Sequence, residues 1–189
     1  MNTTKAKKEK VRNHEIIDYV NNLQTNNLGL SESEIIYLRL RWLKSFLWMD
    51  RAAVVHKFMH YFMRLIMAVG AVLIPTFVSA NNSRLQNYIL AIGLIVAIST
   101  AIEELFRYKD YWYHYRTNAE LLRSEGWQFF QLVGNYKEYL SHKEAFSSFA
   151  TRIETIAQSS VDSFLSKIIQ EKENIVNKKI AAAQNNKDP

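Results

Sequence analysis

Residues 65–80 read LIMAVGAVLIPTFVSA, and none of these sixteen side chains is charged. As an α-helix the run would be about 24 Å long, at about 1.5 Å per residue. Apolar and aromatic residues within 58–63 extend it toward the roughly 30 Å of a bilayer core. A buried helix of a soluble protein keeps a polar face, whereas residues 65–75 have none. The stretch therefore predicts a transmembrane helix over 57–80.

A second apolar run, LQNYILAIGLIVAISTAI at residues 85–102, follows after the four-residue sequence NNSR at 81–84. It ends at two acidic residues, Glu103 and Glu104. A second transmembrane helix is expected over 85–106. Because the loop 81–84 is so short, the two helices must be antiparallel neighbours.

Basic residues are concentrated on one side of this predicted hairpin, and the loop 81–84 contains only Arg84. The positive-inside rule therefore places both termini in the cytoplasm and makes the chain a multi-pass protein of the inner (plasma) membrane. The net charge of +6 fits attraction to an anionic lipid surface, and no nucleic-acid partner is expected. The flanking basic residues are Arg39, Arg41, Lys44, Arg51, Lys57 and Arg64 before the first run, and Arg107, Lys109, Arg116 and Arg123 after the second.

The rest of the chain favours helix, because 189 residues contain only two prolines and five glycines. The predicted fold class is all-α: an integral membrane protein with a two-helix transmembrane hairpin and long cytoplasmic helices that form a bundle. Ser31 stands three residues before Glu34, the spacing of a capping box, which predicts the start of a long helix. The other predicted segments are a basic arm with a short amphipathic helix (1–30), the cytoplasmic part of the long helix (31–56), a cytoplasmic helix (107–133), a C-terminal helix (137–179) and a disordered tail (180–189).

The helix after the second span is expected to run without interruption over 105–133, with Gly126 as its one weak point. Gly134-Asn135 is typical of a helix C-cap and turn. Apolar residues of these long helices should bury against one another within and between subunits: Leu38, Trp42, Phe129 and Phe149.

Several short motifs are distributed over residues 50–165. They are Leu73-Ile74-Pro75, Glu103-Glu104-Leu105-Phe106-Arg107, Trp112, Tyr115-Arg116, Ala119-Glu120-Leu121-Leu122, Glu125-Gly126-Trp127-Gln128-Phe129, Gly134-Asn135-Tyr136, Phe149 and Glu154. With them the chain resembles the SLATT superfamily of prokaryotic two-transmembrane proteins, in a SLATT-like branch of uncharacterised function. The Tyr-Arg-x-x-Ala-Glu-x-Leu run at 115–122 is the most specific part. The family commonly ends in an acidic pair and a tryptophan, which residues 158–164 lack.

The SLATT resemblance implies a pore-former of a bacterial inner membrane, since members are thought to alter membrane permeability. Two spans cannot enclose an aqueous path, so such a pore would be a homo-oligomer around a symmetry axis. A tetramer is the working assumption. Cations would be the permeant ions, with Ca²⁺ as one candidate. The alternative is a non-conducting membrane scaffold or effector whose cytoplasmic helices bind a partner.

One face of the second span is a candidate pore lining, because Gly93, Ala97, Thr100 and Glu104 coincide at about 100° per residue. A ring of Glu104 carboxylates at the cytoplasmic end would select cations. Alternatively, Gly93 and Ala97 form the packing seam of the hairpin.

Other polar residues near the spans, Glu103, Asn81 and Asn82, are secondary candidates for selecting cations. Glu103 lies about 100° from the Glu104 face and is expected to pair with Arg107, four residues on. Asn81 and Asn82 are candidates for the outer mouth of a pore, although a turn alone explains them.

His56 and His60 are one helical turn apart, a spacing that suits a metal. No carboxylate or third ligand is near them in sequence, so interface histidines are the preferred interpretation. The chain has no cysteine, no Gly-rich phosphate loop and no Gly-x-Ser-x-Gly motif. We therefore expect no enzyme activity and no cofactor.

Overall fold

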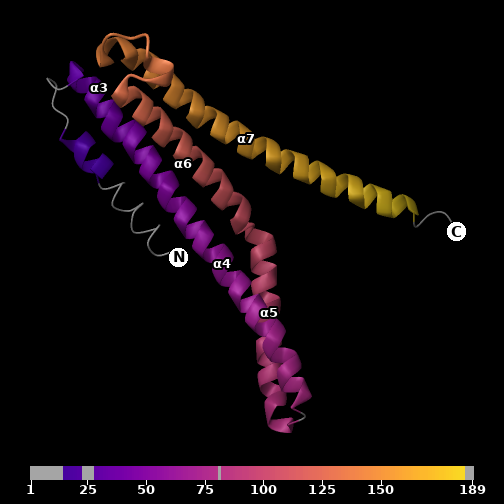
Figure 1. Cartoon of the computed structure of the whole chain (residues 1–189). Helices are drawn as coiled ribbons and strands as arrows, with labels where there is room; N and C mark the ends of the chain where they lie inside the picture. Colours follow the sequence, from indigo (N-terminus) through magenta and orange to yellow (C-terminus); the bar gives the residue numbers. More distant parts are fainter. Residues whose placement is uncertain (1–14, 23–27, 81, 186–189) are drawn as a thin grey trace. The chain divides into compact units, whose positions relative to one another are not determined.

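A computed structural model of the chain describes residues 15–22, 28–80 and 82–185, which are helical apart from short connections and contain no strand (Figure 1). The predicted all-α class is thereby confirmed. A short helix over 15–21 comes first. The others are α3 (Glu32–Tyr37), η1 (Leu38–Leu43), α4 (Lys44–Ser79), η2 (Ser83–Leu85), α5 (Gln86–Phe106), α6 (Tyr108–Gln131), η3 (Gly134–Tyr136) and α7 (His142–Asn185).

The chain divides into two compact units, and each is described by itself. The first contains the described residues up to Phe46 and those from Glu120 onward, and the second is Leu47–Ala119. The boundaries between the units fall inside α4 and α6. Residues 1–14, the greater part of the predicted basic arm, lie outside the described residues.

In the first unit, the predicted capping box begins α3. The Ser31 backbone N–H donates to Glu34 Oε2 at 2.7 Å, and the Ser31 hydroxyl donates to the same oxygen at 2.8 Å. Downstream of α3 the helix widens into the π-helical segment η1, which presents Leu38, Trp42 and Leu43 to the core. The pattern of apolar residues did not predict this widening.

Aromatic rings form the core of the first unit. Phe129 stacks on Phe149 with ring centroids 4.3 Å apart, and Trp42 meets Phe149 edge-on at 6.2 Å. The predicted burial of Leu38, Trp42, Phe129 and Phe149 is confirmed within one chain, where all are at most 2% exposed.

Gly126 does not weaken α6, which continues through it. A Cβ at this position would clash with the indole of Trp42, so glycine is what allows the tryptophan to pack against the helix backbone.

α7 is tied to the rest of the first unit by two carboxylates. Buried Glu125 accepts hydrogen bonds from the Tyr136 hydroxyl at 2.5 Å and from Arg152. Glu154 accepts from Tyr37 at 2.7 Å and from Arg41 at 2.8 and 2.5 Å. Burial and the bond to Glu125 raise the pKa of Tyr136.

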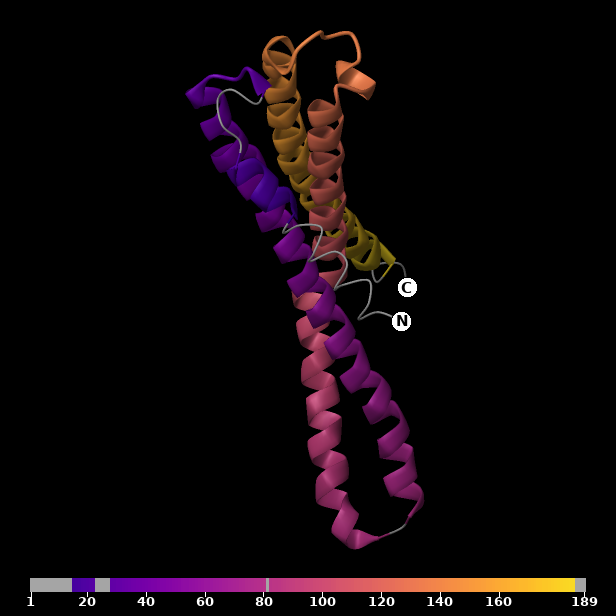
Figure 2. The same cartoon turned by 60° about the vertical axis from the view of Figure 1, so that its left-hand side comes forward.

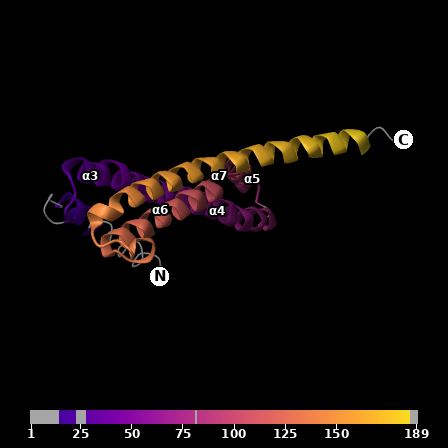
Figure 3. The same ribbon diagram turned by 90° about the horizontal axis from the view of Figure 1, so that it is seen from above.

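α7 is a single helix of 44 residues that ends at Asn185 (Figure 3). The predicted disordered tail at 180–189 is therefore wrong for 180–185, where helical propensity of the alanines at 181–183 prevails over the polar flanks. Residues 186–189 lie outside the described part.

In the second unit, α4 and α5 run antiparallel and are joined by a short connection (Figure 2). They approach closely at Gly70, where a Cβ would clash with Val96. Pro75 lies inside α4 without ending it. The hydroxyls of Thr76 and Ser79 donate to the carbonyls of Val72 and Pro75, at 2.7 and 2.9 Å.

The predicted uninterrupted helix over 105–133 is wrong at one residue. Arg107 has a left-handed backbone (φ 46°, ψ 46°) that ends α5 at Phe106, and α6 begins at Tyr108. The Arg107 N–H still donates to the Glu103 carbonyl at 2.9 Å, as in an αL cap. No glycine marks the break, so the residue types in this segment did not predict it.

Candidate functional site

The α4–α5 hairpin has an apolar surface that its own chain leaves uncovered. Both helices are long and apolar enough to cross a membrane, with best-window mean hydropathies of 1.9 within Glu32–Ser79 and 2.1 within Gln86–Phe106. Only 11% and 6% of these windows are buried. The core helix of a soluble protein would be mostly buried. Large side chains that remain exposed include Phe58, Leu65, Val69, Val72, Leu90, Leu94, Ile98 and Leu105.

A polar pair is buried between the two helices of this apolar hairpin. His60 Nδ1 of α4 lies 2.5 Å from Glu103 Oε1 of α5, and the two side chains are only 11% and 18% exposed. Ser99, one turn before Glu103, is also buried. The other carboxylate oxygen, Glu103 Oε2, is buried and has no hydrogen-bond partner among the described residues.

The expected Glu103–Arg107 pair is therefore wrong. Arg107 NH2 instead lies 2.6 Å from the Asp110 carboxylate. The left-handed backbone at Arg107 interrupts the helical spacing on which an i, i+4 pair depends. Glu103 turns to α4 instead.

His56 and His60 have separate surroundings. His56 Nδ1 lies 2.8 Å from the Ala52 carbonyl oxygen, and its ring packs against Tyr111 and Tyr115 at 5.4 and 5.2 Å. His60 does have a carboxylate beside it, Glu103, although none is near it in sequence. Within the described residues no group of three His, Cys, Asp or Glu side chains is placed to hold a metal ion.

Of the four candidate pore-lining residues of α5, Thr100 reaches α4, because its hydroxyl lies 3.3 Å from Met67 Sδ as well as 2.9 Å from the Val96 carbonyl oxygen. Ala97, Thr100 and Glu104 are exposed and Gly93 is half-buried. Apart from its chain neighbours, no described side chain lies within 4 Å of where a Gly93 Cβ would stand. The alternative that Gly93 and Ala97 form the hairpin seam is thus wrong for the single chain. Gly70, Val96 and the His60–Glu103 pair form that seam.

The turn of the hairpin offers little chemistry. Asn82 is exposed, and its Oδ1 accepts a hydrogen bond from the Arg84 backbone N–H at 3.0 Å, as an ordinary turn residue does. Asn81 lies outside the described residues.

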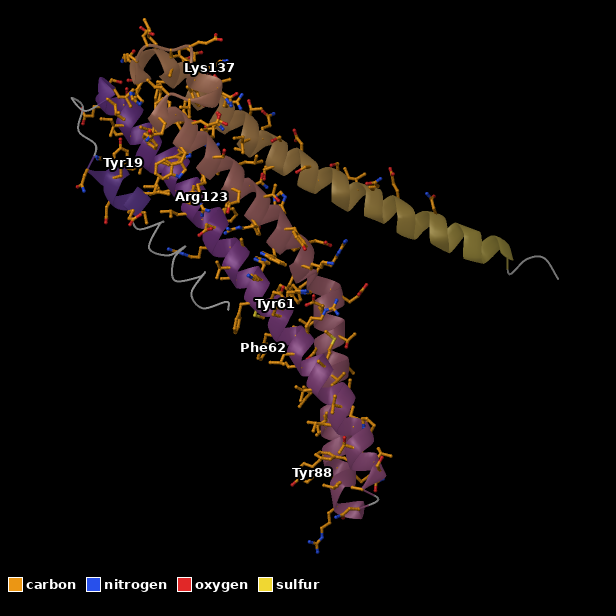
Figure 4. All side chains as sticks on the ribbon, in the orientation of Figure 1. Tyr19, Tyr61, Phe62, Tyr88, Arg123 and Lys137 are labelled. Carbon is orange, nitrogen blue, oxygen red and sulfur yellow. The ribbon has the colours of Figure 1, made fainter. Side chains whose placement is uncertain are left out.

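Polar contacts between residues far apart in the sequence were not predicted. His60 and Glu103 are 43 residues apart, and Arg116 lies 3.1 Å from Asp50, 66 residues before it. Buried Arg123 pairs with Glu120 at 2.9 Å within α6. The sequence signal for the first pair was a histidine, His60, inside the predicted transmembrane segment 57–80. Figure 4 shows the side chains along the hairpin, with Tyr61, Phe62 and Tyr88 labelled.

Comparison with known proteins gives one result. A family described as "Protein of unknown function (DUF4231)" matches residues 44–144, more than half of the chain. The match includes α4, α5 and α6, and therefore both helices of the apolar hairpin and the His60–Glu103 pair. No curated protein and no solved structure matches the chain.

Proposed function

The chain belongs to the DUF4231 family, and we propose that it forms a homo-oligomeric, cation-conducting pore in a prokaryotic inner membrane. Both termini would be cytoplasmic. The resemblance to the SLATT superfamily favours this function, since proteins of that superfamily are thought to form membrane pores. We include the chain in a SLATT-like branch as part of the proposal.

The observation that carries the proposal is a strip of small and polar residues on an otherwise apolar surface. Ala97, Thr100 and Glu104 are exposed on α5 with Leu94, Ile98 and Leu105 exposed beside them. Exposing a large apolar side chain to water instead of burying it costs about 1.5–3 kcal/mol, which lipid removes. The Glu104 carboxylate gains nothing from lipid, whereas the Thr100 hydroxyl already donates to the Val96 carbonyl at 2.9 Å. If several copies surround a common axis with this strip facing the axis, the strip contacts water in the pore and the remaining apolar surface contacts lipid.

Glu104 would then supply one carboxylate per subunit at the cytoplasmic mouth. A ring of such charges concentrates cations, and two carboxylates together bind a divalent ion such as Ca²⁺. The buried Glu103 is held by His60 and would act on the geometry of the hairpin instead of on the ion.

Ion flux through purified protein in liposomes tests the proposal. We expect cation flux in the wild type, and Glu104→Gln should reduce cation-over-anion selectivity several-fold. One unit charge about 4 Å from an ion is worth roughly 1–4 kcal/mol at effective dielectric constants between those of water and a protein surface. Glu32→Gln, at an exposed carboxylate in the first turn of α3, is the matched control and should change nothing.

The second candidate function is a membrane scaffold that binds a partner through its cytoplasmic helices. The observation that favours it is an exposed apolar row on α7, formed by Val161, Leu165 and Ile169 at intervals of four residues. Absence of ion flux at any voltage, with the protein folded in the liposomes, would favour the scaffold over the pore.

A further inference from the structure

A pocket of about 200 Å³ lies in the first unit and is lined by none of the hairpin residues discussed so far. Its walls come from the helix over 15–21, from η1 and from the second half of α6. Figure 4 labels one residue from each side, Tyr19 and Arg123. The residues that line it are Glu15, Ile16, Tyr19, Trp42, Arg123, Trp127, Phe130 and Gln131.

Four of the walls are aromatic rings. Phe130 is met edge-on by Tyr19 at 5.3 Å and by Trp42 at 5.5 Å. Tyr19 and Trp127 are 49% and 47% exposed, so part of each ring is open to a ligand. The indole N–H of Trp42 donates to the Leu122 carbonyl at 2.9 Å, which leaves Trp42 an apolar wall.

The charges around the pocket are unequal. Arg123 is buried, its NH1 donates to both oxygens of Glu120 at 2.9 and 3.0 Å, and its guanidinium lies 5.1 Å above the ring of Phe46. Its positive charge is therefore paired with Glu120, although its Nε is buried and forms no hydrogen bond with the described residues. The Glu15 carboxylate is exposed and forms no ion pair with any described residue. Of the two charged residues that line the pocket, Glu15 is thus the one that forms no ion pair with a described residue, and it lines the pocket together with several π faces.

We propose that this pocket binds a compact organic cation, with the ammonium group beside Glu15 and the organic part between Tyr19, Trp127 and Phe130. Aromatic faces attract cations through their quadrupole, and a carboxylate adds direct charge attraction. An aromatic anion would instead meet the charge of Glu15 and would have to compete with Glu120 for Arg123.

Calorimetric titration of the full chain in nanodiscs of zwitterionic lipid tests this site. The probe is benzyltrimethylammonium, and benzenesulfonate and benzyl alcohol serve as an anion and a neutral compound with the same ring. We expect one saturable site per chain for the cation, and at least tenfold weaker binding of the other two. Zwitterionic lipid avoids a background of cations on an anionic surface.

Two variants locate the binding. Glu15→Gln should weaken the cation about fivefold or more, and Trp127→Leu roughly tenfold. Glu138→Gln makes the same charge change at an exposed residue outside the pocket and should leave the affinity unchanged. Circular dichroism checks that Trp127→Leu is folded. If Trp127→Leu is unfolded, Glu15→Gln still tests the site, because Glu15 is exposed and its substitution does not disturb the core.

Three results would each overturn the proposal. They are no saturable binding of the cation by the wild type at millimolar concentration, binding of benzenesulfonate as tight as that of the cation, and full affinity in Glu15→Gln.

Discussion

At the scale of single residues, two adjacent glutamates have opposite surroundings. Glu103 is buried against His60, whereas Glu104 is exposed on the surface of α5. They are one residue apart, and on a helix that separation is about 100° of rotation. A single turn of α5 therefore supplies one carboxylate for structure and, in the proposed pore, one for ions.

This difference predicts unequal losses of stability. Glu103→Ala leaves His60 without its partner inside the hairpin and should cost about 1–3 kcal/mol, as for other buried polar groups that lose a hydrogen bond. Glu104→Ala should change stability by no more than about 0.5 kcal/mol, as most exposed substitutions do. Thermal unfolding in detergent measures both. Equal effects would mean that the His60–Glu103 contact contributes nothing.

The Arg41–Glu154 ion pair gives a pH-dependent prediction. Hydrogen bonds from Arg41 and then Tyr37 lower the pKa of Glu154 from 4.5 to about 2. The pair's contribution is therefore complete above about pH 4.5 and is lost as the pH falls toward 2. Both side chains are nearly half exposed, so solvent screening limits the contribution to about 0.5–1 kcal/mol.

Arg41→Met should remove this acid-sensitive part of the stability. The difference in unfolding temperature between wild type and variant is expected to be larger at pH 6 than at pH 2. Arg84→Met, at an exposed arginine of the short turn, is the control and should show no such difference. The same gap at both pH values would argue against the ion pair.

At the scale of helices, two glycines of the hairpin should respond in opposite ways. Gly70→Ala places a Cβ against Val96 and is expected to destabilise by about 1–3 kcal/mol, as overpacking does. Apart from its chain neighbours, Gly93→Ala meets no described side chain, and it should be neutral or stabilise by up to about 1 kcal/mol through helix propensity. Unfolding temperature separates the two, and a large loss at Gly93 would mean that another subunit packs there.

The positions of the helices were largely predictable, because each depended on local signals. The Ser31–Glu34 spacing located the start of α3, and the two apolar runs located α4 and α5. The break at Arg107 was not predictable, since arginine has no preference for a left-handed backbone. The partner of Glu103 also could not be predicted, because helical spacing reports only on neighbours within one helix.

At the scale of the whole molecule, the two units differ in how far their apolar side chains are buried. The first unit encloses an aromatic core, whereas the hairpin of the second leaves most of its apolar side chains exposed. Composition averaged over 189 residues hides this contrast, with a mean hydropathy of only −0.19. The assembly with further copies stays a prediction, because the residues that would meet are exposed in the single chain.

The proposed topology can be tested directly because the chain has no cysteine. A cysteine at Asn82 should react with a membrane-impermeant maleimide added to intact spheroplasts. A cysteine at Glu138 should react only after the membrane is opened. Both positions are exposed, so burial does not account for the difference. Labelling of Glu138→Cys but not Asn82→Cys in intact spheroplasts would reverse the orientation.

The π-helical segment η1 has a consequence for the history of the sequence. A π-helical turn bonds residue i to i+5, so it accommodates one residue more than the α-helical turn it interrupts. When one residue is inserted into an α-helix and the helix on either side of the insertion keeps its contacts, the extra residue is accommodated in a π-helical segment of this kind. Relatives of different length before α4 should therefore carry a one-residue gap within 38–43, where the core residues Leu38 and Trp42 can keep their places on both sides of it. A gap anywhere else in this helix would rotate one of its ends by about 100° and expose the core.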